Sequence, residues 1–518
     1  MVLRYRTVQK ASCTLIVLAI VLWQHPSLAR DAGSVTGVVF LDKNANGVRD
    51  HDEPGFSGVA VTLFGKRSDG KPFFLATQTD SQGRFAFPGA LIGQDSNFTV
   101  STGGAPLAAK LPTTYRPERT FYTATDGNDR NSGTREQPFR NIGRAVPQLQ
   151  AGDVLYIRQG EYREYITSMN SPLGSGSGWD RPIVVAGMPG ETVVIRPPDR
   201  ESRDPLISLA FPRQQYLVFD NLILDAEATS MPLRAQASDA KDSPPNHIRV
   251  INCELKNARG SGAVIDGEGH QVVHCRIHDN GRSLEDHGLR ISGGHNLVQG
   301  CDIYCNPGWG ILLDGGPQRM ASNNVIRGNR VHDNDPRRQG SAGIALFSGS
   351  KNLVYDNVVW RNTFGITVNN QGCEQQILNN TVYGNRAPGI AIGTDEETHG
   401  NVVRNNITIE NPDPNLHRGS ETTVYDHNFI AGKPHFRDPQ ADDFHLLPDS
   451  LAIDAGVTIE EIRSDHDGIP RPQGKGYDLG AYEYSEDAFV PTTRSYSTIF
   501  VSGQSYPVLI GFATKAKK

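Results

Sequence analysis

Three short stretches decide the fold: VIRGNRVHDN at residues 325–334, LVYDNVVWRN at 353–362 and QILNNTVYGN at 376–385. Each has an apolar side chain in second place, Asn in fifth, a second apolar side chain in seventh and Asn again in tenth. Apolar residues on both sides of a fixed Asn describe short strands separated by a tight corner. Recurrence of such a unit along the chain is typical of a solenoid.

The repeat begins at residue 247 and continues on both sides of these three stretches, with spacings between 22 and 28 residues. The aligned first corner positions are Cys253, Cys275, Cys301, Asn329, Asn357, Asn380 and Asn406. Each repeat then has a Gly followed by alternating apolar residues, at Gly262, Gly288, Gly310, Gly343, Gly365 and Gly389. Three strands per turn predict a parallel β-helix, in which the Asn amides bond the coils above and below. We expect the three Cys to pack as small apolar side chains.

The segments at either end of this region carry a family resemblance. Residues 121–164 and the stretch from Asp465 to Glu483 resemble the opening and closing segments of secreted pectate-lyase-like right-handed β-helix proteins. The resemblance implies an all-β right-handed parallel β-helix over 118–485, with a capping helix at about 139–149. It implies no particular activity, because this fold hosts lyases, hydrolases, epimerases, esterases and binding proteins.

A loop near the N-terminus has the spacing of a calcium site. Oxygen donors stand at loop positions 1, 3, 5, 9 and 12, and Gly47 at position 6 allows the sharp turn. The predicted Ca²⁺ ligands are Asp42, Asn44, Asn46, Val48 (through its carbonyl), Asp50 and Glu53. A solvated acidic turn is the alternative. The flanks, at 34–40 and 58–64, are rich in β-branched residues and predict strands.

Together, this loop and its flanking strands resemble the SdrD B-like domains of bacterial surface adhesins, within the collagen-adhesin B-type sandwiches. The resemblance implies a small β-sandwich over 33–110 that serves as a calcium-stiffened spacer. The Gly-, Pro- and Thr-rich run that follows predicts a linker at 111–117. Residues 486–518 form a C-terminal extension to which the sequence assigns no role.

The first 29 residues predict a secretory signal peptide. Arg4, Arg6 and Lys10 precede an apolar run of eleven residues, and Ser27 and Ala29 provide small residues before a cleavage site. We therefore expect no membrane span after cleavage, and a location outside a bacterial cell, on its surface or in the periplasm. The whole chain has 51 Lys and Arg against 57 Asp and Glu, which disfavours nucleic acid as a partner. We expect a monomer.

A candidate site follows from the strand after each repeat Gly. The residues one and three places after the Gly should point inward, and Arg290, two places after, should point outward. Asp266 and Asp314 on the neighbouring coils would flank Arg290 diagonally. Such a cluster could bind calcium and a sugar carboxylate, or act as acid and base. Alternatively, Asp266 and Asp314 are turn residues that precede Gly.

Loop lengths point to the same region. Two long loops, 281–287 and 335–342, would wall a short coil whose floor includes Trp309, an aromatic surface that suits sugar rings. Additional predicted contacts to an acidic glycan are Arg282, Asp286, His287, Arg337 and Arg338. A second aromatic row, His278, Tyr304, His332, Trp360 and Tyr383, is either an exposed stripe or a stacked sheet face.

These residues support two hypotheses for function. In the first, the protein is a lyase or epimerase acting on a uronic-acid polysaccharide. His287 would be the base and Arg290 would neutralise the carboxylate. Asp266 and Asp314 would hold a cation, which would make the β-helix cleft a second Ca²⁺ site. In the second, the protein is a non-catalytic carbohydrate-binding or adhesion protein at the cell surface, which the adhesin-like first domain favours.

Overall fold

The computed structural model describes residues 115, 117–167, 172–199, 201, 203–210, 214–237, 243–315, 320–335, 340–412 and 414–484, together with the backbone of the strands near both chain ends. Two compact units are present, and each is considered by itself. Residues 110–466 and 470–484 form the larger unit, and residues 1–109, 467–469 and 485–518 form the smaller. No helix among the described residues is long and apolar enough to cross a membrane.

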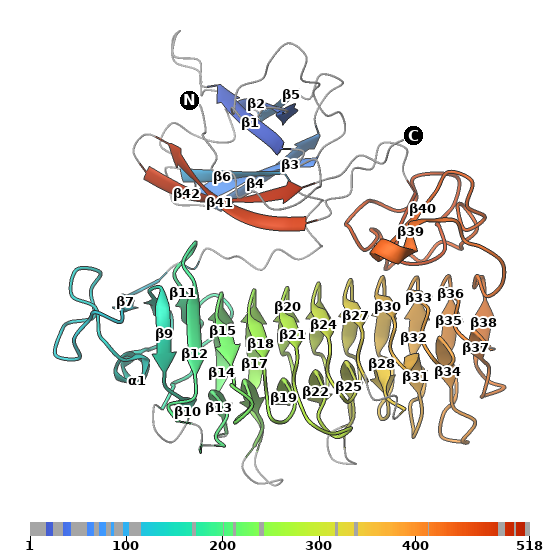
Figure 1. Ribbon diagram of the computed structural model, residues 1–518, viewed down its shortest axis with the longest axis horizontal. Coiled ribbons are helices and arrows are strands. Elements are labelled where there is room, and N and C mark those ends of the chain that lie inside the picture. The colour runs from blue at the N-terminus through green and yellow to red at the C-terminus, as the bar shows by residue number, and fades with distance from the viewer. Residues whose placement is uncertain are drawn as a thin grey trace. The chain divides into compact units, whose positions relative to one another are not determined.

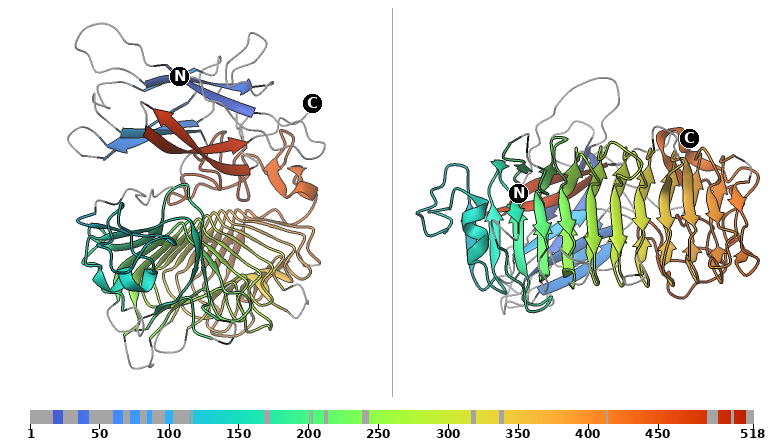
Figure 2. Two further views of the ribbon diagram at one scale, coloured as in Figure 1. Left: turned by 60° about the vertical axis from the view of Figure 1, so that its left-hand side comes forward. Right: turned by 90° about the horizontal axis from the view of Figure 1, so that it is seen from below.

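The larger unit is a parallel β-helix made of three parallel sheets, whose strands follow one another along its length (Figure 1). Each complete coil contributes one strand to each sheet, and successive coils lie one behind another in the left-hand view of Figure 2. The first sheet has twelve strands: β7 (Thr120–Thr123), β8 (Val154–Ile157), β11 (Ile183–Gly187), β14 (Gln215–Asp220), β17 (Asn246–Ile251), β20 (Gln271–Val273), β23 (Leu297–Gln299), β26 (Val325–Arg327), β29 (Leu353–Tyr355), β32 (Gln376–Leu378), β35 (Val402–Arg404) and β38 (Val424–Asp426).

The second and third sheets have ten strands each. The second sheet contains β9 (Gly160–Arg163), β12 (Val193–Arg196), β15 (Ile223–Asp225), β18 (Glu254–Lys256), β21 (Arg276–His278), β24 (Asp302–Tyr304), β27 (Arg330–His332), β30 (Val358–Trp360), β33 (Thr381–Tyr383) and β36 (Ile407–Ile409). The third sheet contains β10 (Ile166–Thr167), β13 (Ile207–Leu209), β16 (Leu233–Ala235), β19 (Ala263–Asp266), β22 (Leu289–Ser292), β25 (Ile311–Leu313), β28 (Ala342–Leu346), β31 (Phe364–Val368), β34 (Ile390–Ile392) and β37 (Leu416–His417).

The core runs along the inside of this helix and confirms the predicted alternation. In β22, for example, Leu289 and Ile291 are buried, whereas Arg290 between them reaches the surface. On the next coil Ile311 and Leu313 are fully buried inside the helix, and Leu312 between them belongs to a separate apolar cluster on the outside. One continuous apolar cluster therefore extends from the first coil to the last. Burial of this strip on every coil drives the stacking.

Asn ladders stabilise the corners, as predicted. Asn357 is fully buried, and its Nδ2 donates to Asn380 Oδ1 at 3.0 Å and to the Ile326 carbonyl at 2.9 Å. Its Oδ1 accepts from Asn329 Nδ2 at 2.9 Å. The second ladder, from Asn280 to Asn411, repeats this pattern at the corner between the second and third sheets.

A third ladder, which the sequence reasoning did not identify, occupies the corner between the third and first sheets. Its members are Asn296, Asn324, Asn352, Gln375 and Asn401. Each member stands five residues before a member of the first ladder. The alignment of repeats that revealed the first ladder therefore also contained the third. Each of the three corners is thus closed by buried amides, which satisfies backbone groups where the strands end.

The predicted packing of the ladder cysteines is confirmed. Cys253, Cys275 and Cys301 are buried in the apolar core. Burial raises the pKa of the Cys253 thiol to about 12, so this group stays protonated at neutral pH. Cys305 is exposed and Cys373 half-buried, and neither is in a disulfide.

The first end of the β-helix is capped, and a closing segment packs beside its last coils. A short helix α1 (Ile142–Ala145) continues into a 3-10 turn, η2 (Val146–Gln148), and its apolar side chains join the core, which confirms the predicted cap in a shorter form. Near the other end, β39 (Phe436–Asp438), η3 (Pro439–Ala441) and β40 (Asp443–Leu446) pack on the second sheet. In the closing segment, fully buried Arg471 donates to Glu483 at 2.7 Å and to Asp356 at 3.1 Å.

The smaller unit contains two sheets. One has β1 (Val17–Trp23), β2 (Val35–Asp42) and β5 (Arg84–Phe87). The other has β3 (Ala60–Lys66), β4 (Pro72–Gln78), β6 (Asn97–Thr102), β41 (Thr493–Val501) and β42 (Gln504–Phe512). The strands predicted on either side of the calcium loop are therefore present, and two strands of the C-terminal extension join the second of these sheets.

The predicted calcium ligands lie almost entirely outside the described residues. Asp42 ends β2, and Asn44, Asn46, Val48, Asp50 and Glu53 are not described. Within the apolar run of the predicted signal peptide, Val17–Trp23 form β1, which pairs with β2. Calcium binding and signal cleavage both stay predictions.

Candidate functional site on the third sheet

The outer face of the third sheet carries the predicted site residues, and it is called the third-sheet face below. Arg290 lies on this face in β22, between Val264 of β19 and Leu312 of β25. Its Nη2 donates to Asp314 Oδ2 at 3.1 Å, and the two side chains are 40% and 38% exposed. The predicted outward direction of Arg290 and its contact with Asp314 are therefore present.

Asp266, the other predicted acidic partner, is held differently. It is buried at the end of β19, and its Oδ2 accepts from Gln236 Nε2 at 2.9 Å. Its carbonyl contacts His270 Nε2 at 3.0 Å, and the following Gly267 has a φ of +120°. These contacts match the alternative in which Asp266 serves the turn. Among the described residues, no group of three or more His, Cys, Asp or Glu gathers as a metal site, so a cation here stays a prediction.

His287 immediately precedes the repeat Gly of the same coil. The residue is 4% exposed, and its ring lies 4.9 Å from that of Trp309. Burial, aided by the positive charge of Arg290, lowers its pKa to about 4. His287 is therefore neutral at neutral pH and able to accept a proton.

Two buried polar atoms at this site have no hydrogen-bond partner within the described part of the chain: His287 Nδ1 and Arg290 Nε. Nδ1 packs against Gly308, where an added Cβ would come within 2.6 Å of it. This leaves Nε2 as the ring nitrogen that could accept a proton from outside. Buried polar groups without partners are uncommon in folded proteins and are informative where they occur together.

Trp309, the predicted aromatic floor, lies on the outside of the third sheet, and its contact with a sugar ring stays a prediction. It is half-buried, and its ring meets that of Phe347 edge to face at 5.2 Å. Both rings pack against an apolar cluster on the outside of β25, β28 and β31. The members of this cluster are Leu312, Ala342 and Ala345, with Trp309, Phe347 and Phe364 packed beside them. An aromatic surface next to a cation is a common way to hold a sugar ring and its acidic group.

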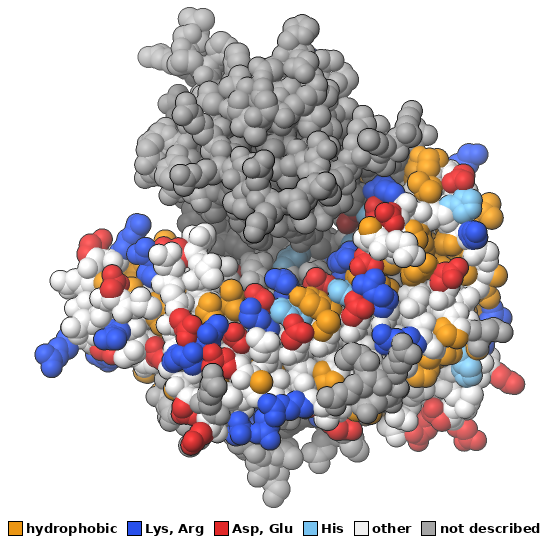
Figure 3. Space-filling model, in the orientation of Figure 1, with side chains coloured by type: hydrophobic (Ala, Val, Ile, Leu, Met, Phe, Trp, Pro, Cys, Tyr) orange, Lys and Arg blue, Asp and Glu red, His pale blue; other side chains and the backbone are white. Residues whose placement is uncertain are grey.

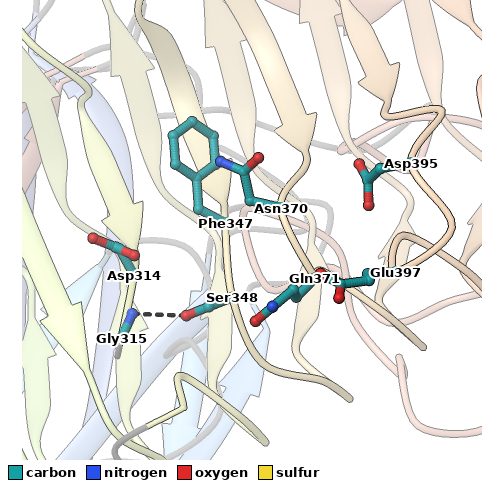
Figure 4. Close-up of a pocket in the computed structure, with 8 residues that line it drawn as sticks. All are labelled: Asp314, Gly315, Phe347, Ser348, Asn370, Gln371, Asp395 and Glu397. Carbon is teal, nitrogen blue, oxygen red and sulfur yellow. Dashed lines mark hydrogen bonds between the residues drawn. The ribbon is translucent and has the colours of Figure 1, made fainter. Parts of the chain in front are cut away.

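An open hollow of about 440 Å³ adjoins this floor where four neighbouring strands end. Its lining residues follow β25, β28, β31 and β34, and are Asp314, Gly315, Phe347, Ser348, Asn370, Gln371, Asp395 and Glu397 (Figure 4). The Gly315 N–H donates to Ser348 Oγ at 2.7 Å. Asp314 thus joins the hollow to Arg290. Sequence reasoning did not identify Asp395 and Glu397, because they lie in a loop without a repeat signal.

In each of the two predicted wall loops, an Asp side chain accepts hydrogen bonds from its own loop. Asp286 Oδ2 accepts three hydrogen bonds of 2.9 Å within its own loop, from Arg282 and Ser283. Asp335 does the same in the other loop, accepting from Gly340 and Ser341 N–H groups. The structure therefore shows Asp286 organising its loop, and contact with a substrate stays a prediction.

The predicted basic contacts are only partly described. Arg282 is exposed, and its Nη2 donates to the Ala228 carbonyl at 2.9 Å, which ties the first loop to a neighbouring turn. Arg337 and Arg338 lie outside the described residues.

The second aromatic row lies on the outer face of the second sheet, called the second-sheet face below, and it is a stacked sheet face. His278, Tyr304, His332 and Trp360 stack in sequence, with ring centres 4.7, 5.0 and 4.1 Å apart. Trp360 is fully buried against Phe444, so the row ends beneath the closing segment. Figure 3 shows acidic, basic and histidine side chains side by side on this face, over β18 to β27.

Carboxylates hold the histidines of this row. His332 contacts Asp302 at 3.1 Å through Nε2 and Asp333 at 2.8 Å through Nδ1. Burial opposes the charged ring, but the hydrogen bonds to the two carboxylates outweigh it and raise the pKa of His332. His278 contacts Glu254 and Asp279 in the same way.

Comparison with known proteins agrees with this architecture. Residues 261–429 match the profile of the right-handed β-helix region, residues 33–116 match the SdrD B-like domain, and residues 125–169 match DUF1565, a family of unknown function. The chain therefore carries a right-handed parallel β-helix and an SdrD B-like domain, which confirms the predicted fold and both predicted resemblances.

Two relatives extend this comparison. The uncharacterized protein YwoF of Bacillus subtilis strain 168 is 26% identical over 343 residues, which cover 59% of this chain and 72% of YwoF. The crystal structure of pectate lyase Pel9A superimposes with a TM-score of 0.53 and 18% identity, covering 71% of this chain and 97% of Pel9A. At this identity, the likeness to Pel9A shows the fold alone.

Proposed function

We propose that the protein binds an acidic polysaccharide on the third-sheet face and acts on it as a lyase or an epimerase. One observation carries the proposal: an exposed guanidinium, a half-buried Trp ring and a neutral His meet on this face, and within the described residues Arg290 Nε and His287 Nδ1 have no hydrogen-bond partner. An exposed guanidinium beside an aromatic ring and a neutral imidazole fits a ligand that has a carboxylate and a sugar ring.

The proposed chemistry begins next to the carboxylate of a uronic-acid residue. His287, at Nε2, removes the proton from the carbon that bears the carboxylate, and Arg290 stabilises the negative charge that builds on that group. In a lyase, the electron pair then forms a carbon–carbon double bond while the glycosidic oxygen leaves and takes up a proton. In an epimerase, a proton returns to the same carbon from the other side.

The fold supports the substrate class without assigning an activity. Pel9A, which has the same fold, is by its name a lyase of pectate. Parallel β-helices of this kind serve many activities, so the assignment to this chain depends on the third-sheet face.

The test is incubation of the protein with a panel of uronic-acid polysaccharides. Absorbance of unsaturated products reports a lyase, and a change in the ratio of the two uronic acids reports an epimerase. Loss of either signal in His287→Gln, with an unchanged melting temperature, would support the proposal. No product with any acidic polysaccharide would contradict it.

A non-catalytic adhesion protein is the second candidate, and the SdrD B-like match favours it. In that case, polysaccharide should bind to the wild-type protein without any change in the polysaccharide. Binding measured by calorimetry, combined with product analysis of the same mixture, separates the two functions.

We also propose that the 42–53 loop binds one Ca²⁺ and stiffens the 33–110 domain. The support is the donor spacing of the sequence, which matches a twelve-residue calcium loop. Calorimetry should detect one binding event, and a chelator should lower the melting temperature. Absence of both effects would contradict this proposal.

A further inference from the structure

The row of outward residues that contains Arg290 extends further back along the third sheet than the sequence repeat reveals. Val264 of β19 pairs with Arg290 of β22 on one side and with Arg234 of β16 on the other. Arg234 and Arg290 therefore stand on the same row of the third-sheet face, separated by one coil. Because parallel strands lie about 4.8 Å apart, their Cα atoms are roughly 10 Å apart along the helix axis.

Arg234 is also available for a ligand. It is half-buried, and it makes no side-chain hydrogen bond or ion pair with any other described residue. Val264, between the two arginines, has a short apolar side chain that cannot neutralise either of them. The nearby Gln236 bonds Asp266, which satisfies part of that carboxylate within the protein.

Beyond Arg290, the same face becomes aromatic and apolar. Trp309 follows on the next coil, and Phe347 follows on the coil after it. Along the axis, the face thus changes from a cationic part, at β16 to β22, to an aromatic part, at β25 to β31. A ligand that lay across the strands would meet only one coil, whereas a ligand along the axis would meet both parts.

We propose that Arg234 and Arg290 form two anion subsites of one axial binding surface, which continues to Trp309. The ligand is a glycan chain with at least two carboxylates, bound parallel to the helix axis. This inference rests on the proposed function of the third-sheet face and adds the direction of the chain, its minimum length and a second residue that determines specificity.

The test measures binding of uronic-acid oligosaccharides of increasing length to wild type, Arg234→Ala, Arg290→Ala and Arg135→Ala. Arg135 is exposed in the loop before α1 and serves as a control for the loss of one positive charge. Wild type should gain affinity once the oligosaccharide reaches both arginines. Arg234→Ala should lose roughly 10–100-fold for these longer chains and change little for a single uronic acid, because a hydrogen bond to a charged group is worth that much.

Each outcome decides a separate question. Equal affinities of Arg234→Ala and Arg135→Ala for the long chains would overturn the second subsite, while a loss confined to Arg290→Ala would leave the proposed function intact. Failure of wild type to bind any acidic glycan would overturn both proposals.

Two further ligands test the chemistry of the subsites. A neutral oligosaccharide of the same length should bind weakly to wild type and be insensitive to Arg234→Ala. A sulfated oligosaccharide that binds while the uronic-acid series does not would overturn the assignment to carboxylates. The melting temperature of Arg234→Ala should match wild type, because Arg234 makes no side-chain hydrogen bond or ion pair with another described residue. Arg290→Ala should lose little, because its ion pair with Asp314 is exposed.

Discussion

Two faces of the same β-helix use similar residues in opposite ways. On the second-sheet face, both nitrogens of His332 contact carboxylates, and its ring is stacked between Tyr304 and Trp360. On the third-sheet face, His287 Nδ1 has no hydrogen-bond partner among the described residues, and the ring touches a half-buried Trp309. The pKa of His332 is raised, whereas that of His287 is lowered to about 4.

The difference separates groups that stabilise the protein from groups that are free to act on a ligand. A His with two carboxylate partners gains stability from its charge and has no spare hydrogen-bonding capacity. A neutral His beside a partly unsatisfied Arg retains such capacity. Aromatic residues alone would not distinguish the faces, since both have a row of rings. The two faces differ in whether their polar side-chain atoms have hydrogen-bond partners.

The largest effect is expected for Arg290→Ala on the third-sheet face. Loss of the group that stabilises the carboxylate should lower activity roughly 100–1,000-fold. Stability should change by no more than about 0.5 kcal/mol, because the ion pair with Asp314 is exposed. Product formation and urea unfolding should be measured on the same preparation. Normal turnover by the variant would show that the third-sheet face is not the site.

A residue that belongs to neither face provides the next test. Gln375, in the third ladder, is fully buried and donates to the Gly349 carbonyl at 2.8 Å, whereas its neighbour Gln376 is exposed. Gln375→Ala should destabilise the protein by roughly 1–3 kcal/mol, because it leaves buried groups unpaired. Gln376→Ala is the matched control and should be nearly neutral. Equal unfolding free energies would contradict the ladder, and activity should survive in both.

The pH dependence of activity tests the neutral His287. If this residue is the base, activity requires its unprotonated form, and its pKa is about 4. The ratio kcat/KM should therefore hold from neutral pH down to about 5 and fall roughly tenfold per pH unit below 4. A fall of kcat/KM already near pH 6.5, the ordinary pKa of His, would exclude His287 as the base.

His332 should show the opposite behaviour, in stability instead of activity. Its folded-state pKa is raised, so the stability it contributes is fully present below its unfolded pKa of about 6.5 and is lost as pH rises through the higher folded value. Removing the charged ring in His332→Gln should cost about 1 kcal/mol at pH 6. This cost should shrink toward pH 9, and activity should remain.

The acidic partners of His332 set the lower end of the pH range in which the charged ring stabilises the protein. Asp302 and Asp333 have lowered pKa values, so their contribution is lost as pH falls through those folded values. Chemical unfolding of wild type and His332→Gln at several pH values checks the sign. A cost that grows with pH would contradict the raised pKa.

The smallest effect is expected for Trp309→Ala. Loss of the aromatic floor should weaken glycan binding by about 0.5–1.5 kcal/mol, the usual worth of such ring contacts. Trp309→Phe retains a ring and should recover part of the affinity. Calorimetry on the longest oligosaccharide that binds provides the measurement. Unchanged affinity in both variants would show that the ligand does not reach β25.

Sequence reasoning succeeded where the signal repeats. The Gly-based register correctly placed Arg290 outward and Ile291 inward, since alternation in a strand is fixed by backbone geometry. It missed Arg234, because the coils before residue 247 have longer connections that hide the period. It also took Asp266 as a partner of Arg290, whereas the structure shows Asp266 bonded to Gln236 from the preceding coil.

The sequence by itself determined the solenoid and its inner surface. Alternating apolar residues and corner amides contact the same kinds of residue on the neighbouring coils. Because every repeat has both features, the repeat pattern predicts the stacking of the coils. Only the tertiary structure decided on which outer face the polar side-chain atoms have hydrogen-bond partners and on which they do not. The partners of His332 and the neighbours of His287 come from different coils and loops, and the pKa of each ring depends on how they meet.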